Sequence, residues 1–100
     1  MPILIEYAYD MHMEIEWDAA KAAANLKKHG VSFEEGATSL LDPLALAQED
    51  YGATDEVRWV LIGISAAARL LTVVYTLRAE NRIRLISARK ATRKEASFYA

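Results

Sequence analysis

The sequence has no cysteine, and its 100 residues include only two histidines, two prolines and four glycines. Without cysteine there is neither a disulfide framework nor a thiolate metal site, which fits a cytoplasmic protein without requiring one. The carboxylates are not paired with histidine at ligand spacing, so we expect no metal and no cofactor. No apolar run approaches the roughly 20 residues that span a membrane, and the N-terminus lacks the basic segment of a signal peptide.

The net charge of −2 conceals a strong asymmetry along the chain. Residues 1–68 carry four Lys or Arg against twelve Asp or Glu, whereas residues 69–100 carry eight against two. This division indicates either an anionic ligand at the C-terminal half or compensation of charge within the fold. We expect the acidic first part of the chain to lie away from the basic surface.

Local signals predict two helices near the N-terminus and a third at the C-terminus. Asp18 is a good N-cap for "AAKAAANLKKHG", which ends at Gly30. Ser32 begins a capping box for "FEEGATSLL", and Thr92 begins another for a short C-terminal helix. The apolar stripe expected on the first helix comprises Ala19, Ala22, Ala23 and Leu26.

The middle of the chain has the pattern of a β-sheet. A short strand is expected at "EIEWD", before the first helix. The strands of the sheet are expected at residues 44–48, 57–65, 70–78 and 82–88, and their short connections favour an antiparallel meander. We therefore predict an α+β fold: two N-terminal helices packed on one face of a four-stranded, mostly antiparallel sheet, plus a short C-terminal helix. Residues 1–12 are interpreted as an N-terminal extension and residues 13–100 as a single domain.

Basic residues crowd into the last strand and helix, "RIRLISARKATRKE". Arg82 and Arg84 alternate with apolar residues, but the alternation breaks at Leu85 and Ile86, which are adjacent and both apolar. Without a bulge, the residues on either side of this step would point to opposite faces of the sheet. We favour a β-bulge, which would place on one surface Arg82, Arg84, Ser87 and Arg89, with Arg78 near the adjacent hairpin end.

Arginine suits phosphate because its planar fork holds two oxygens at once and never loses its proton. Several arginines on a sheet face would bind an RNA backbone and stabilise a phosphorane-like transition state. The alternative is an edge strand that carries arginine to prevent pairing with another sheet.

Two further candidates lie around the first helix. His29 is at the C-terminal end of the helix, where the dipole favours its charged form, so it would bind phosphate or donate a proton, or simply cap the helix. Trp17 precedes the N-cap and would either stack on a base or pack against the sheet. Trp59 and Tyr75 are expected in the core.

Two long motifs in this order resemble the BrnT family of toxins from bacterial type II toxin–antitoxin systems. They are "EIEWDAAKAAANLKKHGVSFEEGAT" and, after "DP", "RWVLIGIS" and "LLTVVYT", the stretch "RIRLISARKATRKE". The resemblance covers about residues 13–99. It implies a RelE-like fold, metal-independent RNA cleavage, and an antitoxin similar to BrnA with a ribbon-helix-helix part, through which the hetero-oligomer would bind operator DNA.

The resemblance and the arginine pattern together give the expected site. The catalytic candidates are Arg58, Arg82 and Arg89, with His29 or Lys28 transferring protons. The RNA-binding candidates are Trp17, Arg78, Arg84, Ser87 and Lys90. The alternative function is a non-catalytic or degenerate module whose basic face docks an antitoxin or nucleic acid.

Overall fold

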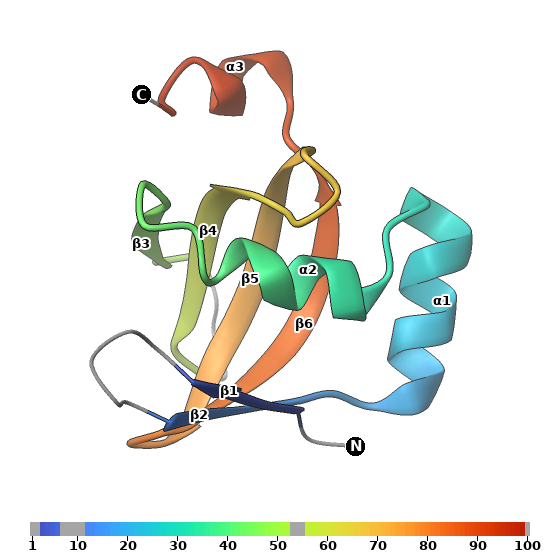
Figure 1. Cartoon of the computed structure of the whole chain (residues 1–100), viewed down its shortest axis with the longest axis vertical. Coiled ribbons are helices and arrows are strands. Elements are labelled where there is room, and N and C mark those ends of the chain that lie inside the picture. Colours follow the sequence, from blue (N-terminus) through green and yellow to red (C-terminus); the bar gives the residue numbers. More distant parts are fainter. Residues whose placement is uncertain (1–2, 7–11, 53–55, 100) are drawn as a thin grey trace.

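The computed structural model describes residues 3–6, 12–52 and 56–99, which form one mixed sheet with helices on it (Figure 1). The described strands follow the spatial order β1-β2-β6-β5-β4-β3. All neighbouring strands are antiparallel except β2 and β6, which run parallel. The strands are β1 (Ile3–Glu6), β2 (His12–Glu16), β3 (Leu46–Asp50), β4 (Arg58–Ile64), β5 (Leu70–Ala79) and β6 (Arg82–Lys90). The helices are α1 (Ala19–His29), α2 (Phe33–Ser39) and α3 (Arg93–Ala96).

The sheet is larger than the sequence indicated. The prediction of four strands was wrong: β3 to β6 form the expected meander, but β2 adds to β6 and β1 adds to β2. The β2–β6 pairing joins Glu14 to Arg82, which are 68 positions apart in the chain. Because these residues are so distant in the sequence, no local pattern predicts that their strands pair. β1 lies within the segment interpreted as an extension, and the domain boundary at residue 13 stays a prediction.

The predicted helix caps are present. The Asp18 side chain accepts a hydrogen bond from the Lys21 amide, and Gly30 closes α1 in the left-handed conformation with φ of 69°. The complete capping box of α3 is formed by Thr92 and Glu95. Ser32 caps α2 as expected, although the carboxylate of its Glu35 binds elsewhere. In the part of the chain that the structure describes, none of the helices has the length and apolar character needed to cross a bilayer.

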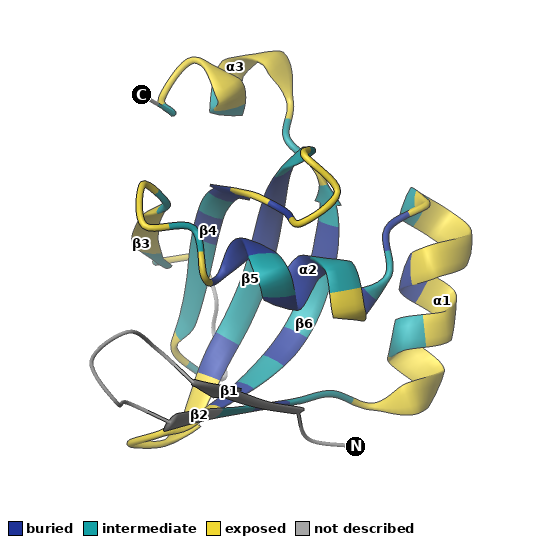
Figure 2. Ribbon diagram, in the orientation of Figure 1, coloured by how far each residue is buried: buried dark blue, intermediate teal, exposed yellow. Residues whose placement is uncertain are grey.

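One face of the sheet carries the core. α2 lies across β4, β5 and β6, and α1 lies beside β6 (Figure 1). Buried residues follow this layer along the central strands and the inner side of α2 (Figure 2). α2 approaches β6 so closely that a Cβ added at Gly36 would lie 2.8 Å from the Cβ of Ala88. The fully buried side chains of this core include Ile15, Val31, Phe33, Leu71, Val73 and Ala88.

The stripe predicted to bury α1 was wrong. Leu26 is 51% exposed, and Ala22 is the only member of that stripe packed against the core, whereas Asn25 is buried. The Asn25 amide donates to the carbonyls of Val31 and Ala88 at 2.9 and 2.8 Å and accepts from the Ala88 amide at 3.2 Å. α1 therefore docks through a polar side chain that satisfies the backbone of β6, not through a broad apolar stripe.

The opposite face of the sheet is only partly covered. α3 lies at one end of it, where the Thr72 hydroxyl donates to Glu95 Oε1 at 2.9 Å. The Tyr99 hydroxyl, just after α3, donates to Asp42 Oδ2. Beyond this helix the face carries polar and charged side chains, and we call it the open face.

Candidate functional site

The predicted bulge in β6 is present. β5 pairs Val74 with Ser87 but Tyr75 with Leu85, so Ile86 is the extra residue. The two apolar residues on the other side of the strand, Ile83 and Leu85, are buried under the helices. The arginine alignment that follows is the predicted one, and the residues that share the open face are Arg82, Arg84, Ser87 and Arg89.

Arg58 joins this face from β4. The β4–β5 register pairs Val60 with Val74 and Ile62 with Thr72, which sets even-numbered positions of β4 toward the open side. Arg58 therefore shares a face with the arginines of β6. Arg78 lies in a second irregularity of the β5–β6 ladder, between Leu77 and Ala79, and is exposed at that end of the sheet.

Each arginine of the open face has a glutamate partner. Glu14 and Glu16 stand opposite Arg82 and Arg84 because β2 pairs in parallel with β6. The expectation that the acidic half lies away from this face was wrong, since this half supplies three of the four partners. The ion pairs are Arg82–Glu14 at 2.8 Å, Arg84–Glu16 at 3.6 Å, Arg58–Glu56 at 3.8 Å and Arg89–Glu95 at 2.7 Å.

The four arginines are not held equally. Arg82 and Arg89 each donate two hydrogen bonds to their glutamates, between 2.7 and 3.0 Å. Arg58 and Arg84 stand at ion-pair distance only, and the Nε atom of each is buried without a hydrogen-bond partner among the described residues. A buried donor without an acceptor is rare in proteins, so these two guanidinium groups are the least satisfied on the face.

Glu95 joins α3 to the open face. Its carboxylate accepts from Arg89, from the Thr92 amide at 2.8 Å and from Thr72. The Arg89 hydrogen bonds are the largest cause that lowers the pKa of Glu95 to about 2. The Glu95 carboxylate is therefore ionised throughout the neutral range. Its two hydrogen bonds from Arg89 hold that side chain between β6 and α3.

Other predicted site residues lie on the helix-covered side. Lys90 pairs with the fully buried Leu71, which sets Lys90 on the side opposite to Arg89. There the Glu35 carboxylate is held by Arg69, with Nε to Oε2 at 2.9 Å. The hydrogen bond from Arg69 is the main cause that lowers the pKa of Glu35, and the charge of Lys90 contributes less.

Lys28 and His29 end α1 next to this side. Lys28 is exposed and His29 is half-buried, while Arg69 Nη2 donates to the neighbouring Gly30 carbonyl at 3.3 Å. Among the described residues, no hydrogen bond or ion pair joins Lys28 or His29 to the arginines of the open face. Their part in proton transfer stays a prediction.

Trp17 is placed by packing. Its ring meets Phe33 edge to face, with centroids 5.9 Å apart and an interplanar angle of 80°. Trp17 therefore packs on the core through a residue of α2, not directly on the sheet, and its stacking on a base stays a prediction. Tyr75 pairs with Trp59 across β4 and β5 and packs against the core, as expected from its position in the strand. The same expectation for Trp59 was wrong, because this residue is only half-buried and lies outside the core cluster.

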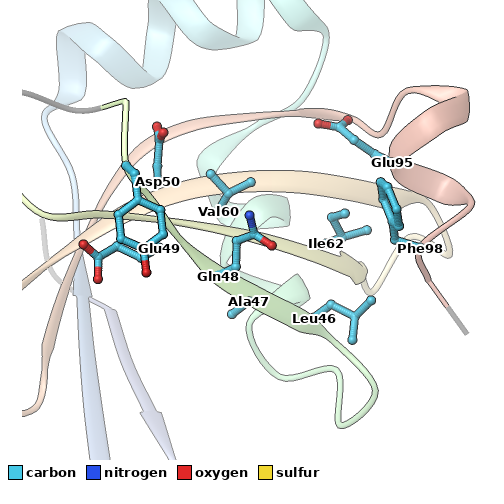
Figure 3. A pocket seen from close by; sticks show the side chains of 10 residues that line it. Leu46, Ala47, Gln48, Glu49, Asp50, Val60, Ile62, Glu95 and Phe98 are labelled. Carbon is cyan, nitrogen blue, oxygen red and sulfur yellow. The ribbon is translucent and has the colours of Figure 1, made fainter.

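A groove on the open face was not found from the sequence. It has a volume of about 620 Å³ and lies between β3, the outer part of β4 and α3 (Figure 3). Val60 and Ile62 line its floor, and Phe98, which is 60% exposed, lies at one end. Gln48, on the edge strand β3, projects into the groove beside Val60 and Ile62. The sequence predicts only a strand at residues 44–48, and it assigns no role to Phe98, so nothing local indicated a groove between them.

Metal ligands do not gather in the part of the chain that the structure describes: no three side chains of His, Asp or Glu there could hold one ion. The open face instead concentrates guanidinium groups, which bind anions directly. The fold and this face define a small α+β domain that presents arginines from two strands of one sheet.

Comparisons with known proteins agree with this class. The model of the family described as "Ribonuclease toxin, BrnT, of type II toxin-antitoxin system" matches residues 17–95. The crystal structure of the Brucella abortus ribonuclease toxin BrnT superposes with a TM-score of 0.58 at 23% identity, covering 79% of this chain and 96% of that one. No curated protein matches the sequence significantly.

The chain belongs to the BrnT family of ribonuclease toxins. The family match extends from Trp17 to Glu95, so it includes α1 and α2, the strands β3 to β6 and the start of α3. The resemblance noted in the sequence is therefore confirmed.

Proposed function

We propose that this protein is a metal-independent RNA endonuclease whose open face binds the RNA backbone and cleaves it. The observation that carries the proposal is the alignment of Arg58, Arg84 and Arg89 on one exposed side of the sheet. Membership of a family of ribonuclease toxins supports the same reaction.

The proposed cleavage needs no nucleophile from the protein, because the RNA supplies it, and the protein has to stabilise the charge of the transition state. The ribose 2′-hydroxyl gives its proton to a base and its oxygen attacks the adjacent phosphorus. The bond to the 5′-oxygen breaks, this oxygen takes up a proton, and a 2′,3′-cyclic phosphate and a 5′-hydroxyl result. Negative charge accumulates on the phosphoryl oxygens in the transition state, where fixed guanidinium groups stabilise it. Arg58 and Arg84 suit this role, because among the described residues their glutamates stand at 3.8 and 3.6 Å and hold neither guanidinium group by a hydrogen bond.

The glutamate partners set the condition for binding. A phosphate must take the place of Glu16 at Arg84 and of Glu56 at Arg58, where the present distances are 3.6 and 3.8 Å. Ion pairs as exposed as these contribute little stability, so exchange is cheap. Arg82 and Arg89 are bound more firmly by their glutamates and would position the backbone at the two ends of the face.

The remaining candidates have supporting roles in this proposal. Ser87 lies between Arg84 and Arg89 and would donate a hydrogen bond to a phosphate oxygen. Arg78, at the end of β5, would bind the RNA backbone where it leaves the open face. Lys28 and His29 end α1 next to the helix-covered side, so they would transfer protons only to RNA that passes around the edge of β6. Lys90 and Trp17 belong to the helix-covered side and would contact RNA only around the edge of β6.

We propose that the natural partner is an antitoxin similar to BrnA, with a ribbon-helix-helix part that binds operator DNA for the hetero-oligomer. Cleavage of RNA by the free toxin would inhibit translation and growth, and the antitoxin would prevent it. Membership of a type II toxin–antitoxin family supports a protein antitoxin.

The test is cleavage of RNA by purified protein in EDTA, together with growth inhibition on expression. We expect R58A and R84A each to lower the rate of cleavage by about a hundredfold, as is typical when one transition-state donor is removed. R93A, in the exposed first turn of α3, removes the same charge away from the face and is the matched control. A folded R58A/R84A double variant that cleaves at the wild-type rate would contradict the proposal.

One observation favours the second function, a non-catalytic binding module. All four arginines of the open face have carboxylate partners, so this part of the face carries little net charge. RNA that is retarded in a gel by the wild-type protein but never cleaved would support this alternative.

A further inference from the structure

The groove beside α3 shares the open face with the arginines. Ile62, on its floor, pairs with Thr72, which pairs in turn with Arg89. Neighbouring strands are about 5 Å apart, so Ile62 and Arg89 are separated by about 10 Å. Arg58, whose glutamate is at ion-pair distance only, is two positions before Val60 on β4, about 7 Å along the strand. A nucleotide bound to Arg58 by its phosphate would therefore reach the groove.

The charges around the groove select which part of a nucleotide enters it. The carboxylates of Asp50 and Glu95 line the groove at opposite ends (Figure 3). Glu95 is ionised and already bound to Arg89. Carboxylates repel phosphate, but they accept hydrogen bonds from amino groups on the edge of a base.

The walls of the groove suit a flat aromatic ring. Val60 and Ile62 form an apolar floor, and Phe98 stands beside it with 60% of its surface exposed. Its volume of about 620 Å³ is within the range of small-ligand sites. Single-stranded RNA is commonly recognised by unstacked bases that stack on aromatic side chains and form hydrogen bonds through their edges.

We propose that this groove is a nucleobase subsite that prefers a base with an exocyclic amino group. Phe98 stacks on the base, and the Gln48 amide, which forms no side-chain hydrogen bond among the described residues, reads the base edge. The subsite rests on the proposed function, because it takes its nucleotide from the RNA that the arginines hold. Gln48 and Phe98 are thus specificity-determining residues outside the phosphate-binding set.

The experiment measures the affinity of short 2′-O-methyl homopolymers of adenine, cytosine and uracil by fluorescence anisotropy. These oligonucleotides lack the attacking hydroxyl, so binding is read whether or not the protein is an active nuclease. The variants are Gln48→Leu, which keeps the size of the side chain, and Phe98→Ala. Leu26→Ala, on the exposed side of α1, is the control.

The wild-type protein is expected to bind adenine and cytosine polymers more tightly than uracil. Gln48→Leu should weaken the first two by about tenfold and uracil less, which reduces the preference. Phe98→Ala should weaken all three by about tenfold or more, because stacking depends little on the base. Leu26→Ala should leave all three affinities unchanged.

The subsite would be overturned if Gln48→Leu kept the wild-type preference, or if Phe98→Ala bound as tightly as wild type. Absence of binding to every homopolymer would overturn it too. If neither variant changes the affinity for RNA, we would interpret the groove as a binding site for a protein partner. Cleavage of unmodified RNA by the wild-type protein is scored separately, so a protein that binds with the expected preference without cleaving contradicts only the enzyme.

Discussion

Replacing Glu95 with glutamine separates the charge of the Arg89–Glu95 ion pair from the hydrogen bonds of the α3 cap. Glutamine keeps an oxygen that accepts from the Thr92 amide, and it also occurs at this position of a capping box. It loses the negative charge, and its NH₂ group cannot accept the second hydrogen bond of Arg89.

The size of the effect follows from the pKa of Glu95. The ordinary value of 4.5 falls to about 2 in the folded protein, which corresponds to at most about 3 kcal/mol of stability at neutral pH. The Glu95 and Arg89 side chains are 22% and 35% exposed, so solvent screens part of the interaction. We therefore expect E95Q to lower the free energy of unfolding by about 1–2 kcal/mol at pH 7.

The sign of the pH dependence gives a sharper test. A carboxylate whose pKa is lowered by folding stabilises the protein above its unfolded pKa, and this contribution disappears as the pH falls through the folded value. The difference between wild type and E95Q should therefore shrink between pH 4.5 and pH 2. Urea unfolding at several pH values measures it, with E80Q in the exposed β5–β6 turn as the control. An equal difference at pH 7 and near pH 2 would refute the reasoning.

Two further predictions concern the packing of the helices. G36A should gain helix propensity of up to about 1 kcal/mol, yet destabilise the protein by about 1–3 kcal/mol, because its Cβ would lie 2.8 Å from Ala88; a G36A variant with a higher melting temperature than wild type would contradict this. N25A should cost about 2–4 kcal/mol in urea unfolding, because it leaves backbone groups of Val31 and Ala88 unsatisfied. N81A, in the exposed β5–β6 turn, is its control and should change stability little; equal effects of the two would refute the role of Asn25.

The features that were predicted correctly depend on neighbours in the chain. The N-cap at Asp18, the left-handed Gly30 and the capping box of Thr92 all act within a few residues. The bulge at Ile86 was also readable, because two adjacent apolar side chains in an alternating strand must either share burial or shift the register.

The features that were missed depend on contacts between distant segments. The stripe on α1 failed because Ala19 and Ala23 have helical spacing but little surface to bury, whereas Asn25 found backbone partners on β6. The groove was missed because Gln48 and Phe98, 50 positions apart in the chain, line it together only in the tertiary structure.

The class of fold, the family and the face that carries the arginines follow from the sequence alone, because strand alternation and cap chemistry are local properties. The residues that those arginines contact depend on how distant segments pack. The parallel pairing of β2 with β6 sets Glu14 and Glu16 against Arg82 and Arg84, and α3 sets Glu95 against Arg89. The burial of apolar side chains, such as Ile15 beside Ile83, selects the long-range pairing of the strands. This pairing also sets the charged side chains on the opposite face of the two strands beside one another.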